Sequence, residues 1–219
     1  YRSHLLVIIY DVDLTDGATV AEKDEVVLLI GDRFLVSAHG PSNTRVSGAS
    51  DHIEATFERF GPEIGSVVFP ILDAIAEHYL RVVDDVRQMV DALEHRVLME
   101  EEQGAIPELY QLRRALTVLR RVIAPEESLI GARANQMTLL ANPDIQDALL
   151  DVKHNMQSAV DDIEQYLSIL PDILTTFESL KSDNLNRIVK LLTVWSIILT
   201  AVALLLPVTY GLDPAGSLI

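Results

Sequence analysis

Three short apolar runs open the chain. Residues 4–12 (HLLVIIYDV), 25–31 (EVVLLIG) and 33–40 (RFLVSAHG) are rich in Val, Ile and Leu, a pattern that predicts β-strands. Because the runs are nearly continuous in apolar residues, we expect a sheet with helices on both faces. A loop is expected over residues 40–50, followed by a short helix to about residue 60 with Asp51 as its N-cap.

The middle of the chain changes to a helical period. Apolar residues recur every three or four positions from about residue 67 to residue 101, which predicts an amphipathic helix of ~35 residues. Gly104 and Pro107 interrupt the pattern, which then resumes to about residue 135 or beyond. Since the connection is short, the two helices are expected to pack as an antiparallel hairpin.

A third helical pattern begins at Asn142-Pro143, an N-cap residue followed by proline at the first helical position. Its apolar residues keep a spacing of three and four through a long stretch: Met156, Val160, Ile163, Leu167, Leu170, Leu174 and Phe177. No glycine interrupts the chain from residue 143 to residue 210. The pattern therefore predicts a single helix of roughly 90 Å at about 1.5 Å per residue.

The end of this helix is uncharged. Residues 191–210 hold no charged side chain, and about twenty apolar residues cross a bilayer core of roughly 30 Å. We predict one transmembrane helix here. Lys181, Arg187 and Lys190 precede it and only Asp213 follows it, a bias that places the N-terminal side in the cytoplasm.

One face of the predicted span carries small and polar side chains at helical spacing: Asn186, Val189, Thr193, Ser196 and Thr200. The bulky Trp195 faces elsewhere. Such a face suits a helix that lines water or packs against copies of itself. Alternatively, the hydroxyls bond back to their own helix carbonyls, or the small residues only allow close helix packing.

Charge and composition narrow the function. The chain has 33 acidic and 17 basic side chains, a formal net charge of −16. This disfavours nucleic acid, whose binding rests on Lys and Arg at phosphates, and favours cations. With no cysteine, the chain has neither disulfides nor thiolate metal ligands.

Motifs for catalysis are missing from the sequence. It contains no dinucleotide-binding, Walker, zinc-protease or nucleophile-elbow motif, so we expect no catalytic residue and no enzyme. No two histidines lie four residues apart among His4, His39, His52, His78, His95 and His154. Glu77-His78 and Glu94-His95 fall in a helical pattern and are predicted to be surface residues.

An acidic segment, DVDLTDG, covers residues 11–17 between the first two strands. It resembles the start of an EF-hand loop, but the glycine falls one position late and strands replace the flanking helices. The EF-hand is therefore rejected. An acidic hairpin loop remains, either a solvated turn or a contributor to cation binding.

Two motifs near the predicted span resemble a known family. Residues 186–193 read N-x-x-V-K-x-L-T, and after an apolar helix with Pro207 the chain reads Y-G-L-D at residues 210–213. This is similar to the pore helix of the CorA-type magnesium transport family, where the patterns are close to N-x-x-M-K-x-L-T and Y-G-M-N. Leu212 and Asp213 depart from that pattern. Residues 36–39, 72–98 and 113–127 also resemble the family's last cytosolic strand and its paired long helices.

The resemblance implies a fold class: α+β and mostly helical, with a partial α/β cytosolic domain, a long antiparallel helix hairpin, and a very long stalk helix that continues into a transmembrane pore helix. We assign these parts to residues 1–60, 61–141, 142–187 and 188–210, with residues 211–219 as a loop. In the family a second span follows that loop. The complete protein is therefore expected to be multi-pass in the cell (inner) membrane, with a cytoplasmic N-terminal domain.

The resemblance also implies an assembly and its sites. We expect a homo-oligomer, a pentamer, embedded in membrane lipid. Its pore and gate would be formed by Asn186, Val189, Leu192, Thr193, Ser196 and Thr200, and its ion entrance by Gly211, Leu212 and Asp213. Asp151 matches a family aspartate that meets an acidic loop of the neighbouring subunit across a regulatory ion, and here Asp13 or Asp16 is the expected partner. Mg²⁺, or else Co²⁺, Ni²⁺ or Zn²⁺, would be both the transported and the regulatory ion.

Two functions remain open from the sequence. The first is a divalent-cation channel or transporter subunit, gated by cytosolic divalent ion binding. The second is a membrane-tethered helical sensor or assembly protein of the same fold without transport activity, which the departures at Leu212 and Asp213 would permit.

Overall fold

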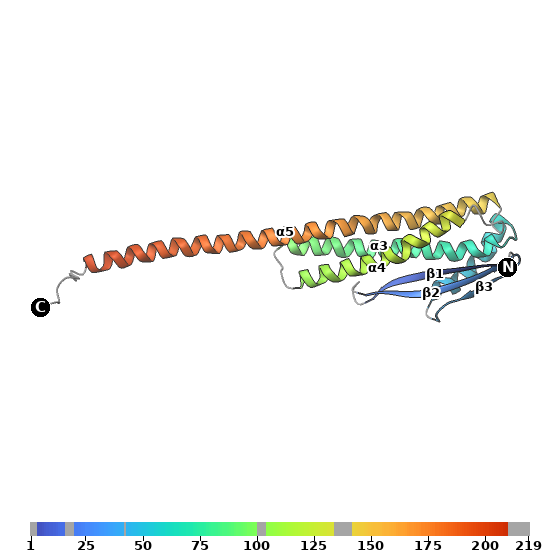
Figure 1. The fold of residues 1–219 in the computed structure, drawn as a ribbon, viewed down its shortest axis with the longest axis horizontal. Coiled ribbons are helices and arrows are strands. Elements are labelled where there is room, and N and C mark those ends of the chain that lie inside the picture. Colours follow the sequence, from blue (N-terminus) through green and yellow to red (C-terminus); the bar gives the residue numbers. More distant parts are fainter. Residues whose placement is uncertain (1–3, 16–19, 42, 100–103, 134–141, 210–219) are drawn as a thin grey trace. The chain divides into compact units, whose positions relative to one another are not determined.

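A computed structural model gives the structure of residues 4–15, 20–41, 43–99, 104–133 and 142–209. It is mostly helical and has one small sheet (Figure 1), so the predicted α+β fold class is confirmed. The chain divides into two compact units, Tyr1–Ile173 and Leu174–Ile219. The long helix α5 (Pro143–Thr209) contributes to both units.

The sheet is an antiparallel meander of β1 (His4–Thr15), β2 (Val20–Gly31) and β3 (Leu35–Ala38), in that order. The β1–β2 pairing runs from His4 opposite Gly31 to Thr15 opposite Val20. Both strands are longer than predicted. Asp11 and Asp13 belong to β1 rather than to a loop, because their side chains find partners on neighbouring helices and the strand continues through them.

Helices cover one face of this sheet. Val7, Ile9 and Leu28 on that face are buried, whereas Leu6 is 60% exposed and Val36 is 54% exposed on the other. The expectation of helices on both faces is therefore wrong for the described part of the chain. Alternation still holds along the strands, but the outward side chains are apolar as well, which made the runs look buried on both sides.

Two short helices follow β3: the first replaces most of the predicted loop, and the second is the predicted short helix. They are α1 (Thr44–Ala49) and α2 (Ile53–Phe60), joined by a 3₁₀ turn (Ser50–His52). The side-chain oxygen of Asn43 accepts the N–H of Val46 at 3.1 Å and so starts α1. Asp51 lies inside the 3₁₀ turn, so its predicted role as N-cap is wrong. The local cap at Asn43 extends the helical region upstream.

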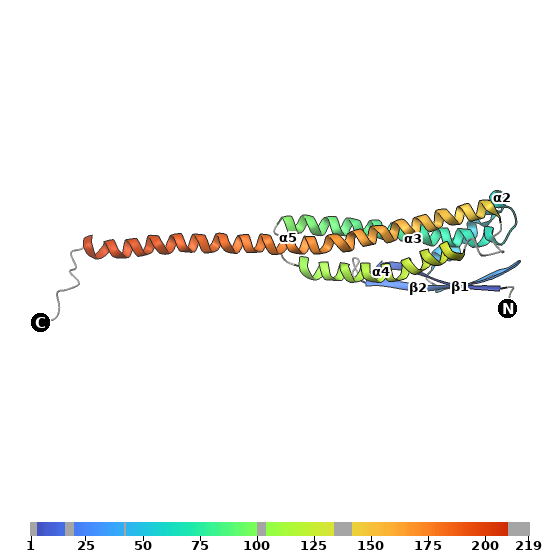
Figure 2. The same ribbon diagram turned by 45° about the horizontal axis from the view of Figure 1, so that its top comes forward.

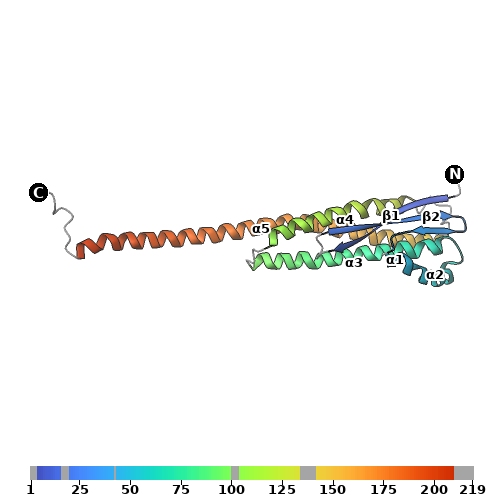
Figure 3. The same cartoon turned by 90° about the horizontal axis from the view of Figure 1, so that it is seen from below.

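The helix hairpin is confirmed. It consists of α3 (Gly65–Leu98) and α4 (Ala105–Arg133). Within the first unit these two helices lie between the sheet and the N-terminal part of α5 (Figures 2 and 3). Their fully buried large side chains form the middle of the core: Ile75, Tyr79, Leu93, Leu116, Leu119 and Ile123.

Helix α5 begins as predicted. The side-chain oxygen of Asn142 accepts the N–H of Asp144 at 3.0 Å, and Pro143 is the first helical residue. The buried stripe that follows comprises Ile145, Leu149, Val152, Met156, Ala159, Ile163 and Leu170. Val160 and Leu167, which the spacing also assigned to this stripe, are only half-buried.

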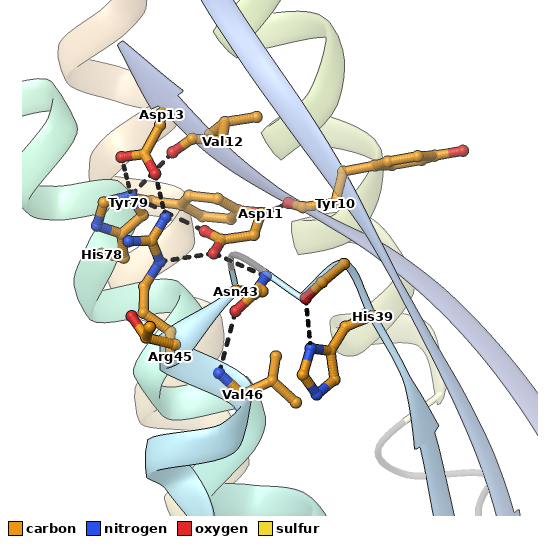
Figure 4. Close-up of polar contacts among 12 residues, drawn as sticks. Tyr10, Asp11, Val12, Asp13, His39, Asn43, Arg45, Val46, His78 and Tyr79 are labelled. Carbon is orange, nitrogen blue, oxygen red and sulfur yellow. Dashed lines mark hydrogen bonds and ion pairs between the residues drawn. The ribbon is translucent and has the colours of Figure 1, made fainter. Parts of the chain in front are cut away.

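Side chains from the helices close the free edge of β1 (Figure 4). His78 on α3 lies with Nε2 2.9 Å from the carbonyl oxygen of Val12. Since a carbonyl only accepts, Nε2 must carry the hydrogen. The prediction that His78 is a surface residue is wrong: it is 8% exposed, because this carbonyl gives the imidazole a partner inside the core. Glu77, Glu94 and His95 are exposed as predicted.

A buried ion pair holds β1 to α1. The Asp11 side chain is 1% exposed, and its Oδ2 accepts Arg45 Nε at 2.5 Å and Asn43 Nδ2 at 3.1 Å. Arg45 also pairs with Asp13. Isolated charges in a protein interior are costly, so the guanidinium is what permits a carboxylate at this position.

We therefore predict that Arg45→Ala lowers the free energy of unfolding by about 3 kcal/mol, because it leaves Asp11 buried without its counter-charge. Urea unfolding followed by circular dichroism measures this. Arg87→Ala is the matched control, since Arg87 pairs with Asp84 at the exposed surface, where solvent screens the charges, and it should cost much less. Equal losses in the two variants would contradict this account.

Candidate functional site

The polar face of α5 lies in the second unit. All six predicted pore and gate residues are helical and exposed in the single chain: Asn186, Val189, Leu192, Thr193, Ser196 and Thr200. The helix is uninterrupted here because the segment consists of good helix formers and β-branched residues, without glycine or internal proline before Pro207. The face is therefore available to water, to lipid or to another copy.

Two of the three hydroxyls on this face bond to their own helix. Thr193 Oγ1 donates to the carbonyl oxygen of Val189, and Thr200 Oγ1 donates to that of Ser196, both at 2.8 Å. This matches one alternative left open by the sequence. The bonds use the hydroxyl protons only, so the oxygen lone pairs remain able to accept from water around a cation. Among the described residues, the Asn186 side chain has no hydrogen-bond partner.

The remaining faces of this segment are apolar. Trp195 is 61% exposed and Leu204 is 68% exposed. Of the described helices, α5 alone is long and apolar enough to cross a membrane, as judged by length and composition. Gly211, Leu212 and Asp213, the predicted ion entrance, lie outside the described residues, and so does Asp16.

A cluster of carboxylates surrounds Asp151 in the first unit. Asp151 is exposed on α5. Asp73 on α3 is half-buried, and its pKa is raised by this burial first and then by the negative charges of Glu77 and Asp151, while Arg59 opposes the shift. Glu77 and Asp151 are therefore each close enough to repel Asp73.

Asp13, by contrast, is already paired. One of its oxygens pairs with Arg45, and the other lies 3.1 Å from His78 Nε2. Within one chain the Asp13 carboxylate is thus engaged by Arg45 and His78. Among the described residues, no group of three or more His, Cys, Asp or Glu side chains has the geometry to hold a metal ion. A cation at Asp151 would therefore need ligands in addition to the described side chains of one chain.

Sequence reasoning missed several of these residues. Asp73 and Glu77 occupy one side of a helix that looked simply amphipathic, and Arg45 lay in a predicted loop. The available signal was a carboxylate inside an apolar run, at Asp73 in ILDAIA and at Asp11 in IIYDV. An acid at such a position must be paired, protonated or placed at the edge of the core.

Comparison with known proteins gives consistent results. A family model described as CorA-like Mg²⁺ transporter protein matches residues 1–209. The cobalt/magnesium transport protein CorA of Thermotoga maritima is 23% identical over 128 residues, which cover 58% of this chain and 36% of the relative. The zinc transport protein ZntB of Yersinia enterocolitica is 22% identical over 171 residues, covering 76% of this chain and 51% of the relative.

Solved structures share the fold. The CorA magnesium transporter from Methanocaldococcus jannaschii superposes with a TM-score of 0.76 at 17% identity, covering 99% of this chain and 68% of that chain. The full-length CmaX protein gives a TM-score of 0.73 at 18% identity, covering 100% of this chain and 65% of that chain.

The chain spans from 36% to 60% of the length of the curated relatives it matches. The family model, however, covers nearly all of its residues. This protein belongs to the family of CorA-like Mg²⁺ transporter proteins.

Proposed function

We propose that the chain is a subunit of a divalent-cation transporter that assembles as a homo-oligomer, a pentamer, in the membrane. The observation that carries this proposal is the polar face of an otherwise apolar, uninterrupted α5. One such helix cannot enclose a path for an ion, so copies must surround an axis. The first unit is then cytoplasmic, because Lys181, Arg187 and Lys190 lie on its side of the span.

The chemistry of the face fits a hydrated cation. Mg²⁺ gives up its water reluctantly, so its path should offer oxygens that hydrogen-bond to the hydration shell. Asn186 supplies an amide and Thr193 a hydroxyl oxygen, one on each side of Val189. Leu192, which is 64% exposed in the single chain, would form an apolar constriction beside them.

Mg²⁺ is the ion we favour. The family description names Mg²⁺, and the relatives include a cobalt/magnesium and a zinc transport protein. The cysteine-free chain has no thiolate ligand, and oxygen donors suit Mg²⁺ better than they suit the later transition metals.

We further propose that cytosolic Mg²⁺ closes this path by binding near Asp151. Glu77 and Asp151 each repel Asp73, and a divalent cation would convert this repulsion into attraction. The missing ligands would come from a neighbouring copy. Asp13 would first have to break its contacts with Arg45 and His78. Of the two partners predicted for Asp151 from the sequence, Asp16 is therefore the better candidate.

The hydrogen bonds of Thr193 and Thr200 to their own helix favour a second candidate, a membrane-tethered sensor or assembly protein without transport. In that case the face does not line a water-filled path, and its small residues allow close packing of helices. Ion flux separates the two candidates directly.

The first prediction concerns Asn186. Replacing Asn186 by Leu should reduce Mg²⁺ uptake into proteoliposomes at least tenfold while leaving the oligomer intact, because it removes the amide that meets the ion's hydration shell. Asn184→Leu is the matched control, since two residues turn a helix by about 200° and place Asn184 on another face. Uptake that is unchanged in the Asn186 variant would place this face against protein or lipid.

The second prediction concerns Asp151. Millimolar Mg²⁺ should protect the first unit of wild-type protein against protease, and Asp151→Ala should remove most of that protection because it takes away a carboxylate facing Asp73. Asp161→Ala, an exposed acid further along the same helix, should remain protected. If Mg²⁺ protects all three proteins equally, the regulatory site does not include Asp151.

A further inference from the structure

Glu126 is a buried carboxyl group that touches two other elements. It lies on α4 and is 6% exposed. Its Oε1 accepts the backbone N–H of Tyr10 at 2.7 Å, and its Oε2 lies 2.6 Å from the hydroxyl of Tyr79 on α3. Since Tyr10 is on the edge strand β1, this one side chain joins α4, α3 and the edge of the sheet.

The two contacts of the Tyr79 hydroxyl require two hydroxyl protons if both are to be hydrogen bonds. The Tyr79 hydroxyl is within hydrogen-bond distance of both Glu126 Oε2 and the carbonyl oxygen of Tyr10. A carbonyl and an ionised carboxylate only accept, and a hydroxyl has a single proton to give. With Glu126 ionised, one of the two contacts therefore joins oxygens with no hydrogen between them.

Protonation of Glu126 satisfies every group. Its Oε2–H then donates to the Tyr79 oxygen, and the Tyr79 hydroxyl donates to the Tyr10 carbonyl. The Tyr10 N–H continues to donate to Oε1. A buried network in which every donor and acceptor is matched is far more favourable than one with an unmatched pair.

The surroundings agree with this arrangement. The pKa of Glu126 is raised to about 7: burial is the main cause, the hydrogen bonds from Tyr79 and the Tyr10 N–H oppose it, and the charge of Asp11 adds to it. The titratable groups that act on Glu126 are Tyr79 from α3 and Asp11 from β1. The cations of β2 and α5 contact its neighbours instead: Lys23 lies over the Tyr10 ring, and Lys153 pairs with Glu127. No cation bonds to Glu126 among the described residues.

We propose that Glu126 is a proton-binding site whose proton fastens α4 to α3 and to the edge of β1, and that this fastening weakens as the surrounding pH rises past neutrality. The ligand is the proton itself. The proposal does not depend on transport. Its tests measure the stability of the folded chain and the protonation of Glu126, not ion flux.

The sign of the pH effect follows from linkage. The folded chain keeps this proton up to a pH of about 7, whereas an unfolded glutamate loses it near the ordinary value of 4.5. Stability is therefore fully present below the unfolded value and falls as the pH rises through the window between the two values. Across that window the folding equilibrium constant should drop by up to about two orders of magnitude.

Glu126→Gln tests the proposal. The amide oxygen can accept from the Tyr10 N–H, and the amide N–H₂ can donate to Tyr79, so the variant imitates the protonated state at every pH. In thermal unfolding of the full chain, the variant should match wild type at about pH 4, below the unfolded value, and exceed its midpoint by an amount that grows through the window and is largest at pH 8. Glu94→Gln removes an exposed carboxylate of α3 and should follow wild type throughout. A Glu126→Gln variant that also follows wild type at every pH overturns the proposal.

A spectroscopic measurement removes any dependence on the variant folding. Infrared spectra of wild-type protein carrying ¹³C-labelled glutamate should show a protonated glutamate at pH 6 that disappears by pH 8. The band should be absent from Glu126→Gln wherever that variant folds. Wild-type protein with no protonated glutamate at pH 6 contradicts the proposal regardless of the variant.

Discussion

The second unit depends on one constraint: its apolar side chains are exposed, with no packing partner in the described part of the chain. Leu192, Ile197 and Leu199 are 64%, 64% and 65% exposed, and burying such a side chain is worth about 1.5–3 kcal/mol. A helix with this composition must find lipid or other copies. Its few polar groups then need water or a partner of their own, and both the proposed membrane placement and the proposed assembly follow from that need.

The first unit faces the opposite problem, because it buries carboxylates. Asp11 is compensated by Arg45, which brings α1 against the strand. Glu126 is instead matched by a proton and by Tyr79. In both cases the acid bonds to groups from other elements, so each fixes how helices meet β1. At the surface, Glu77 and Asp151 repel Asp73 and Arg59 offsets only part of that repulsion, so a cation could relieve the rest.

Periodicity was enough to predict the long elements. The spacing of Leu and Ile gave α3, α4 and α5 to within a few residues, and the Asn142-Pro143 start was correct. Prediction from periodicity failed where a side chain bonds to a partner that is distant in the sequence. His78 is buried because Val12 offers a carbonyl 66 residues away, and β1 runs through Asp11 because Arg45 lies 34 residues further on. Asp73 and Asp151 come together only when α3 packs against α5, so no local sequence pattern indicates that the two are close.

The absence of cysteine allows the most direct test of a water-lined α5. Single cysteines introduced along the helix can be treated with a membrane-impermeant thiol reagent in intact membranes. The account predicts rapid labelling at 186, 189, 193, 196 and 200 and little labelling at 188, 195 and 199, with the labelling slowed by millimolar Mg²⁺. Labelling with no helical period, or strongest at 195 and 199, would contradict a path for ions along this face.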